Sequence, residues 1–128
     1  MPPLQPLLHD EPPLGSSLIQ LWAQAVDAYG AEVAVRGLAA NWTWRELDEA
    51  SDRVAARLLA QGIQRGDRVA IYAINGPEFA IVYLGIMKVG AVVVPVNVLI
   101  KPGEIAFILN DAGARGVFYS GLLGPNLA

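Results

Sequence analysis

Cysteine is missing from this chain, and histidine occurs once among its 128 residues. Without cysteine, the chain can form neither disulfides nor thiolate metal sites. Cysteine usage therefore does not indicate whether the protein works in an oxidising or a reducing compartment. Because His9 is the only histidine, neither a histidine metal cluster nor a Ser-His-Asp triad is expected within the chain. The sequence therefore predicts no metal-binding residue here.

Charged residues are also scarce. They make up 16% of the chain, and nine Lys and Arg against twelve Asp and Glu give a net charge of −3. The basic residues are scattered from Arg36 to Arg115 and form no block, so we expect no nucleic-acid partner. Hydrophobic residues reach 54%, which indicates a folded domain with a covered sheet or a surface that meets another molecule.

The sequence lacks an uninterrupted hydrophobic run long enough to cross a membrane. Residues 79–100 carry one charge, Lys88, but Gly85, Gly90 and Pro95 interrupt them. The first residues also lack the basic region and apolar run of a secretory signal. We therefore expect no membrane span and a cytoplasmic location.

Turn and cap residues divide the rest of the chain into elements. Residues 1–16 are rich in proline and predict a flexible leader, so the folded part should be residues 17–128. The clearest helix starts at Thr43, because Glu46 stands three residues later and completes a capping box. Helices are expected at 17–29, 43–61, 77–89 and 102–111, with strands at 33–36, 68–74, 91–96 and 115–120.

This order predicts an α/β fold. Three strands alternate with two helices, so they should form a short parallel β-α-β-α-β sheet with helices on both faces. Residues 42–43 should pair back on the first strand as a small N-terminal hairpin. The β-branched run Val92–Val94 is typical of a strand buried on both faces.

Polar residues follow all three strands of the predicted sheet. Ligands of open parallel sheets bind beyond the carboxyl ends of the strands, where Asn75, Asn97 and Ser120 are expected. These residue types also cap helices and turns, and we favour that interpretation.

The remaining polar candidates have a structural and a chemical interpretation. Lys88 could be a buried base, but we expect its stem to lie on apolar surface and its ammonium in water. The acids of one helix could hold a metal or transfer protons, but we expect a solvated face. The two tryptophans that flank the cap of that helix could stack on a ligand ring, but we expect them to be core anchors. These residues are Asp48, Glu49, Asp52, Trp42 and Trp44.

Two nucleotide-binding motifs are absent. A dinucleotide fold needs G-x-G-x-x-G after a strand and a P-loop needs G-x-x-x-x-G-K-[ST], and neither occurs. Composition and residue patterns by themselves thus indicate half of a parallel α/β domain without a visible active site.

Five segments nevertheless stand in a telling order, namely Trp42–Leu47, Gly66–Ala70, Asn75–Phe79, Met87–Asn97 and Glu104–Ala114. Together they resemble the adenylate-forming (AMP-binding) superfamily, and most closely its fatty-acyl-CoA synthetases. The first is similar to the family's Leu-Thr-Tyr-x-Glu-Leu motif and the fourth to its Leu-Lys-Ala-Gly-Ala-x-x-Val-Pro-Leu-Asn motif. Lys101 departs from the family, which often has Thr or Ser as the cap before the helix expected at 102–111.

The resemblance implies the N-terminal portion of an ATP-dependent acid–thiol ligase. Such an enzyme joins a carboxylate to ATP with Mg²⁺, forms an acyl-adenylate, and passes the acyl group to coenzyme A. The family's phosphate loop and catalytic residues are expected outside this chain, so no catalytic, cofactor-binding or metal residue is assigned here. We expect an inactive piece whose partner is the rest of its own ligase domain, and which associates with itself when isolated. The alternative is a complete small α/β binding module.

Overall fold

A three-stranded parallel sheet forms the centre of the computed structural model, which describes residues 17–128. The strands are β3 (Arg68–Tyr72), β4 (Val92–Pro95) and β5 (Ala114–Tyr119). Their order is β4-β3-β5, and β3 pairs in parallel with both neighbours. The predicted α/β fold is confirmed.

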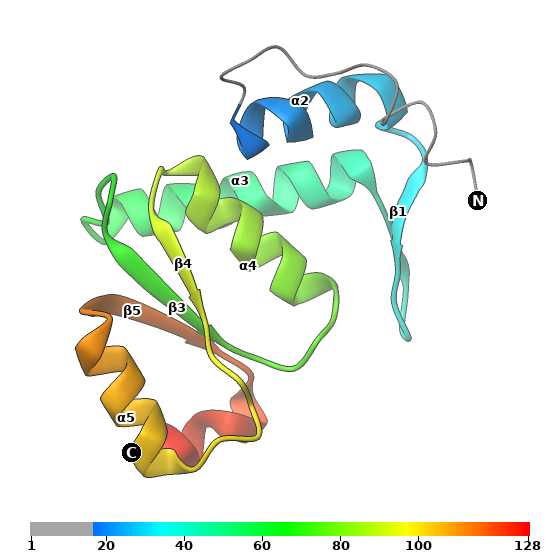
Figure 1. Ribbon diagram of the computed structural model, residues 1–128. Coiled ribbons are helices and arrows are strands. Elements are labelled where there is room, and N and C mark those ends of the chain that lie inside the picture. Colours follow the sequence, from blue (N-terminus) through cyan, green and yellow to red (C-terminus); the bar gives the residue numbers. More distant parts are fainter. Residues whose placement is uncertain (1–16) are drawn as a thin grey trace.

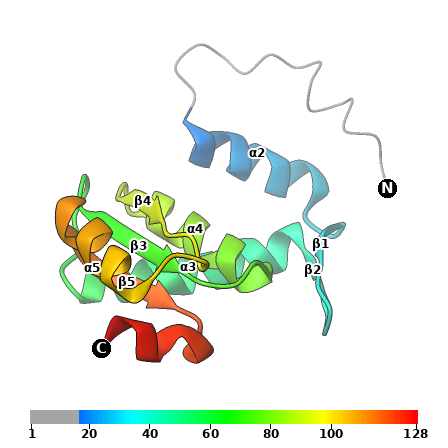
Figure 2. The same ribbon diagram turned by 60° about the horizontal axis from the view of Figure 1, so that its bottom comes forward.

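Helices cover both faces of this sheet (Figures 1 and 2). On one face, α3 (Trp44–Ala60) and α4 (Pro77–Lys88) pack over a core that includes Leu58, Val69 and Ile86. On the other face, α5 (Pro102–Asp111) and the 3-10 helix η1 (Gly121–Leu127) close a second core around Tyr72 and Ile105. The result is the expected three-layer arrangement.

The N-terminal elements form a smaller unit beside α3. Helix α2 (Leu18–Tyr29) lies along the outer side of α3, and the hairpin of β1 (Val33–Arg36) and β2 (Asn41–Thr43) connects the two helices (Figure 1). The hairpin is antiparallel, as predicted. Leu18, at the start of α2, is 65% exposed because α2 buries only one narrow face, around Ala25 and Val26.

Side chains cap two helices as the residue pattern indicated. Thr43 Oγ1 accepts a hydrogen bond from the Glu46 backbone N–H at 3.2 Å, and Glu46 Oε2 accepts one from the Thr43 N–H at 2.8 Å. Ser17 and Gln20 make the same reciprocal pair at α2. At α5, Lys101 cannot accept such a bond, but its backbone N–H donates to Glu104 Oε2 at 3.0 Å. The unusual Lys101 therefore keeps half of a capping box.

The prediction that Val92–Val94 form a strand buried on both faces is wrong. β4 is an edge strand, and Val92 is 48% exposed. The fully buried strand is β3, where Val69, Ala70, Ile71 and Tyr72 are all 0% exposed. β3 was predicted to reach residue 74 but ends at Tyr72. Its pairing with β5 stops where Tyr72 lies opposite Tyr119, and its pairing with β4 stops one residue earlier.

Three further expectations concern the ends and the hydrophobic stretch. The predicted leader, residues 1–16, lies outside the described residues. Residues 121–127, for which no element was predicted, form η1. The stretch 79–100 divides between α4 and β4, and none of the helices in residues 17–128 is long and apolar enough to span a bilayer.

Candidate functional site

A cavity of about 350 Å³ lies where β3 and β5 end, next to the start of α4. Asn75 and Ser120 both line it, so the structure brings two of the three predicted strand-end residues together. Ser120 Oγ accepts a hydrogen bond from the Ile74 backbone N–H at 3.0 Å. The hydroxyl group therefore ties the end of β5 to the segment after β3.

Asn97 lies apart from this cavity. Its Oδ1 accepts a hydrogen bond from the Leu99 backbone N–H at 2.9 Å, which stabilises the turn between β4 and α5. The interpretation of Asn97 as a turn residue is confirmed. Asn97 does not share a site with Asn75 and Ser120.

The lining of the cavity limits its chemistry. Apolar side chains such as Ile71, Phe79 and Phe118 form most of the wall, and Glu78 adds a carboxylate. No lining residue from the described part of the chain is basic. A phosphoryl group needs cations or aligned donors, so this cavity does not have the makeup of a nucleotide phosphate site.

The prediction that the Lys88 ammonium group extends into water is wrong. That group donates to Asp48 Oδ1 at 2.7 Å, to Asp52 Oδ1 at 2.6 Å and to the Asp48 carbonyl oxygen at 3.0 Å. The Lys88 side chain is 14% exposed and that of Asp48 is 29% exposed. The prediction failed because the carboxylates lie 36 and 40 positions away in the chain and only the packing of α4 on α3 brings them close.

This cluster also corrects the expected solvated acidic face. Asp48 accepts a further hydrogen bond from Trp22 Nε1 at 2.8 Å, so it links α2, α3 and α4. Burial raises the pKa of Asp48, but the hydrogen bonds from Lys88 and Trp22 and the nearby positive charges together hold that pKa below its ordinary value. Glu49, by contrast, is exposed as expected.

The aromatic anchors lie as predicted around the start of α3. The Trp44 ring centroid is 5.0 Å from that of Trp22 and 6.4 Å from that of Tyr29. Trp42 packs, partly buried, against the cluster around Leu47. These contacts assign the tryptophans to packing rather than to ring stacking on a ligand.

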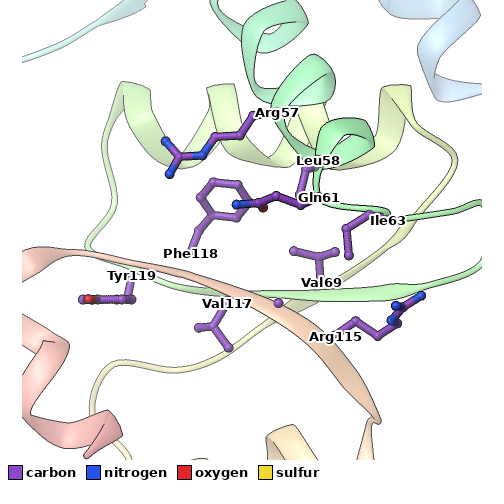
Figure 3. A pocket seen from close by; sticks show the side chains of 10 residues that line it. Arg57, Leu58, Gln61, Ile63, Val69, Arg115, Val117, Phe118 and Tyr119 are labelled. Carbon is purple, nitrogen blue, oxygen red and sulfur yellow. The ribbon is translucent and has the colours of Figure 1, made fainter.

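A wider groove of about 500 Å³ lies between α3 and β5 (Figure 3). Arg57 and Leu58 line it from α3, Gln61 lines it from the residue directly after α3, and residues 115–119 line it from β5. Phe118 points from β5 toward α3, whereas Val117 points to the opposite face (Figure 3). The sequence did not predict this groove, because it depends on which strand lies at the edge of the sheet.

No group of three or more His, Asp or Glu side chains within residues 17–128 could hold a metal ion. Asp48 and Asp52, which lie one turn apart on α3, are both paired with Lys88. The assignment of no catalytic, cofactor or metal residue to this chain remains a prediction.

Two curated relatives of this chain are CoA ligases. It is 34% identical over 116 residues to a crotonobetaine/carnitine–CoA ligase of Citrobacter koseri, a match that covers 87% of this chain and 22% of that protein. The corresponding protein of Escherichia fergusonii is 33% identical over 78% of this chain and 20% of its own length. The chain thus spans about a fifth of the length of these relatives.

Solved structures agree in fold. An anthranilate CoA ligase in complex with anthranoyl-AMP superposes with a TM-score of 0.86 at 24% identity. The match covers 91% of this chain and 22% of the length of that ligase. A Mycobacterium tuberculosis fatty acyl CoA synthetase matches 83% of this chain and 22% of its own with a TM-score of 0.79 at 31% identity.

The family model described as "AMP-binding enzyme" matches residues 22–126. This match includes all three strands of the sheet, the hairpin and the capped helix α3. It confirms the family that the five ordered segments resemble, and the chain belongs to the AMP-binding enzyme family.

Proposed function

We propose that this chain is the N-terminal portion of an ATP-dependent acyl-CoA ligase. The whole enzyme would join a carboxylate to ATP, release pyrophosphate from an acyl-adenylate, and form the thioester with coenzyme A. The family match over residues 22–126 carries the proposal. The names of three relatives, two crotonobetaine/carnitine–CoA ligases and a fatty acyl CoA synthetase, support it.

The chemistry is proposed to reside in the rest of the ligase domain, which is the expected partner of this chain. ATP, Mg²⁺ and coenzyme A belong to that parent enzyme. The 350 Å³ cavity has no basic lining residue in the described chain, and Lys88 is engaged by Asp48 and Asp52. Both observations support a structural role for these residues and an inactive isolated chain.

For the substrate we propose a fatty acid. Similarity to the Mycobacterium tuberculosis fatty acyl CoA synthetase supports this class, whereas other relatives are named for crotonobetaine, carnitine and anthranilate. We further propose a cytoplasmic location.

A complete α/β binding module is the alternative. One observation favours it: within residues 17–128, every buried side-chain nitrogen or oxygen has a hydrogen-bond partner. A reading frame that continues past Ala128 into a Ser/Thr/Gly-rich loop ending in Lys would decide for the ligase. A natural stop codon would decide for the module.

ATP–pyrophosphate exchange tests the proposed division of labour. The purified 128-residue chain is incubated with ATP, Mg²⁺, labelled pyrophosphate and a panel of fatty acids. We expect no incorporation of label above that of a heat-denatured sample. Exchange that depends on an added fatty acid would show that the chain holds the machinery itself.

A further inference from the structure

The segment between β3 and α4 contains the one Asn-Gly pair of the sequence, Asn75-Gly76. Both residues are exposed, and neither belongs to a helix or a strand (Figure 1). Residues 69–72 before them are buried in the sheet, and Pro77 after them begins α4. The pair is therefore the exposed part of the connection between a buried strand and a helix.

An asparagine can react with the residue that follows it in the chain, and it is one of the thermolabile residues. The backbone nitrogen of the next residue attacks the side-chain carbonyl carbon, Cγ, and the amide nitrogen leaves as ammonia. Glycine in the next position favours this attack, because it has no Cβ to crowd the nitrogen and leaves the backbone free to turn.

The Gly76 N–H is available for such a reaction. No backbone oxygen of residues 17–128 accepts a hydrogen bond from it. The Ile74 N–H, by contrast, donates to Ser120 Oγ at 3.0 Å, so the residue before Asn75 is anchored. The Gly76 nitrogen can thus lose its proton and approach Asn75 Cγ without giving up a backbone hydrogen bond of its own.

The other four of the five asparagines lack this combination. Asn41 and Asn110 lie in β2 and α5, whose backbones are held by regular hydrogen bonds. The side-chain amides of Asn97 and Asn126 each make a hydrogen bond, and a bulky residue follows each of them. Local geometry thus singles out Asn75.

We propose that Asn75 deamidates spontaneously through a cyclic imide with Gly76. The Gly76 nitrogen bonds to Asn75 Cγ, the bond from Cγ to Nδ2 breaks, and the displaced proton leaves with that nitrogen as ammonia. Water then opens the ring at Cγ to give aspartate, or at the backbone carbonyl carbon to give isoaspartate, in which the main chain runs through Cγ. The reaction joins two consecutive residues and needs no ligase activity, so it depends neither on an open strand edge nor on the proposed function.

Either product changes the cavity at the ends of β3 and β5. Asn75 and Glu78 both line that cavity, so deamidation puts a second carboxylate into its wall. Isoaspartate also adds a methylene group to the main chain directly after Ile74, whose N–H donates to Ser120 Oγ. This lengthens the connection to α4 and should weaken the hydrogen bond that ties the end of β5 to the segment after β3.

Peptide mass spectrometry of the folded 128-residue chain tests the proposal. The chain is incubated at mildly alkaline pH, digested with trypsin, and compared with a sample digested at once. Peptide 69–88 contains Asn75 and no other asparagine or glutamine, and it should become heavier by about 1 Da with time. A protein isoaspartyl methyltransferase should label the same peptide. Peptide 89–115, which contains Asn97 and Asn110, is the internal control and should stay unchanged.

Two variants test the mechanism. Gly76→Ala should slow the mass gain roughly tenfold or more, because a methyl group at position 76 hinders the attack. This variant should fold, since Gly76 has an extended backbone and an added Cβ would meet only the end of the Glu78 side chain, at 3.0 Å. Asn75→Gln should abolish the gain, because the longer side chain would have to close a larger ring. Circular dichroism shows that both variants keep the fold.

A folded chain whose peptide 69–88 gains no mass would overturn the proposal, whether or not the chain unfolded in urea gains it. Equal rates for the wild type and Gly76→Ala would also overturn it, because the attacking nitrogen would then not be that of Gly76. So would equal rates for peptides 69–88 and 89–115, because the reaction would then not depend on the geometry around Asn75.

Discussion

Lys88 Nζ lies 2.7 Å from Asp48 Oδ1, and this ion pair fastens the last residue of α4 to the N-terminal half of α3. The pair is largely shielded from water, and Trp22 donates to the same carboxylate from α2. Three helices that are distant in the chain thus converge on one carboxyl group.

Neutralising Asp48 should destabilise the fold more than neutralising Asp52. Asp48→Asn leaves the buried Lys88 ammonium with weaker acceptors, which should lower the free energy of unfolding by about 1–3 kcal/mol. Asp52 is 63% exposed, so Asp52→Asn should cost at most about 0.5 kcal/mol. Urea unfolding followed by circular dichroism measures both. Equal losses would contradict the central position of Asp48.

The contribution of Asp48 should vanish in acid. Its folded-state pKa lies below the ordinary value of 3.8, so the charged form stabilises the fold above that pH. This stability is lost as pH falls below 3.8 and through the folded pKa. The gap in unfolding free energy between the wild type and Asp48→Asn should therefore be constant from pH 5 to 7 and close at lower pH. A gap that widened in acid would contradict the direction of the shift.

Helix caps offer a gain as well as a loss of stability. Thr43→Ala removes the side-chain acceptor at α3 and should cost about 1 kcal/mol. Lys101 occupies the equivalent position of α5 without accepting a hydrogen bond, so Lys101→Ser should gain about 0.5–1 kcal/mol. Thermal unfolding of both variants checks this pair. A loss on Lys101→Ser would mean that the lysine side chain has another stabilising contact.

Gly85 permits the close approach of α4 to α3. A Cβ atom at this position would lie 2.5 Å from Val54 Cγ1 and 3.1 Å from the Ser51 carbonyl oxygen. Gly85→Ala should therefore destabilise the fold by about 1–3 kcal/mol despite the better helix propensity of alanine. Adding Val54→Ala should recover part of the loss, which a double-mutant cycle measures. Gly103→Ala in α5 meets nothing within 4 Å and serves as the control.

Local patterns predicted the elements well because their causes are local. The Thr43–Glu46 and Ser17–Gln20 pairs place a cap and its partner within one turn, so the helix starts can be predicted from three residues of spacing. The alternation of strands and helices likewise predicted the parallel sheet. The family could be predicted because five such segments occur in a fixed order.

Burial and side-chain partners could not be predicted in the same way. Whether Val92–Val94 or β3 lies at the centre depends on strand order, which is set by contacts between residues far apart in the chain. The partner of Lys88 is 40 positions away, and Ser120 bonds to a residue 46 positions away. Asn97, by contrast, could be predicted as a turn residue because the N–H that its Oδ1 accepts from, that of Leu99, is only two residues ahead.

We propose that residues 22–126 can replace the corresponding segment of an AMP-binding CoA ligase. A graft tests it most directly: these residues replace the matching segment of the Citrobacter koseri crotonobetaine/carnitine–CoA ligase, with which the chain shares 34% identity. Thermal unfolding confirms that the graft folds, and ATP–pyrophosphate exchange is then measured with carnitine and crotonobetaine. We expect exchange that requires the added acid. A graft that folds as the parent ligase does and yet exchanges no label would contradict it.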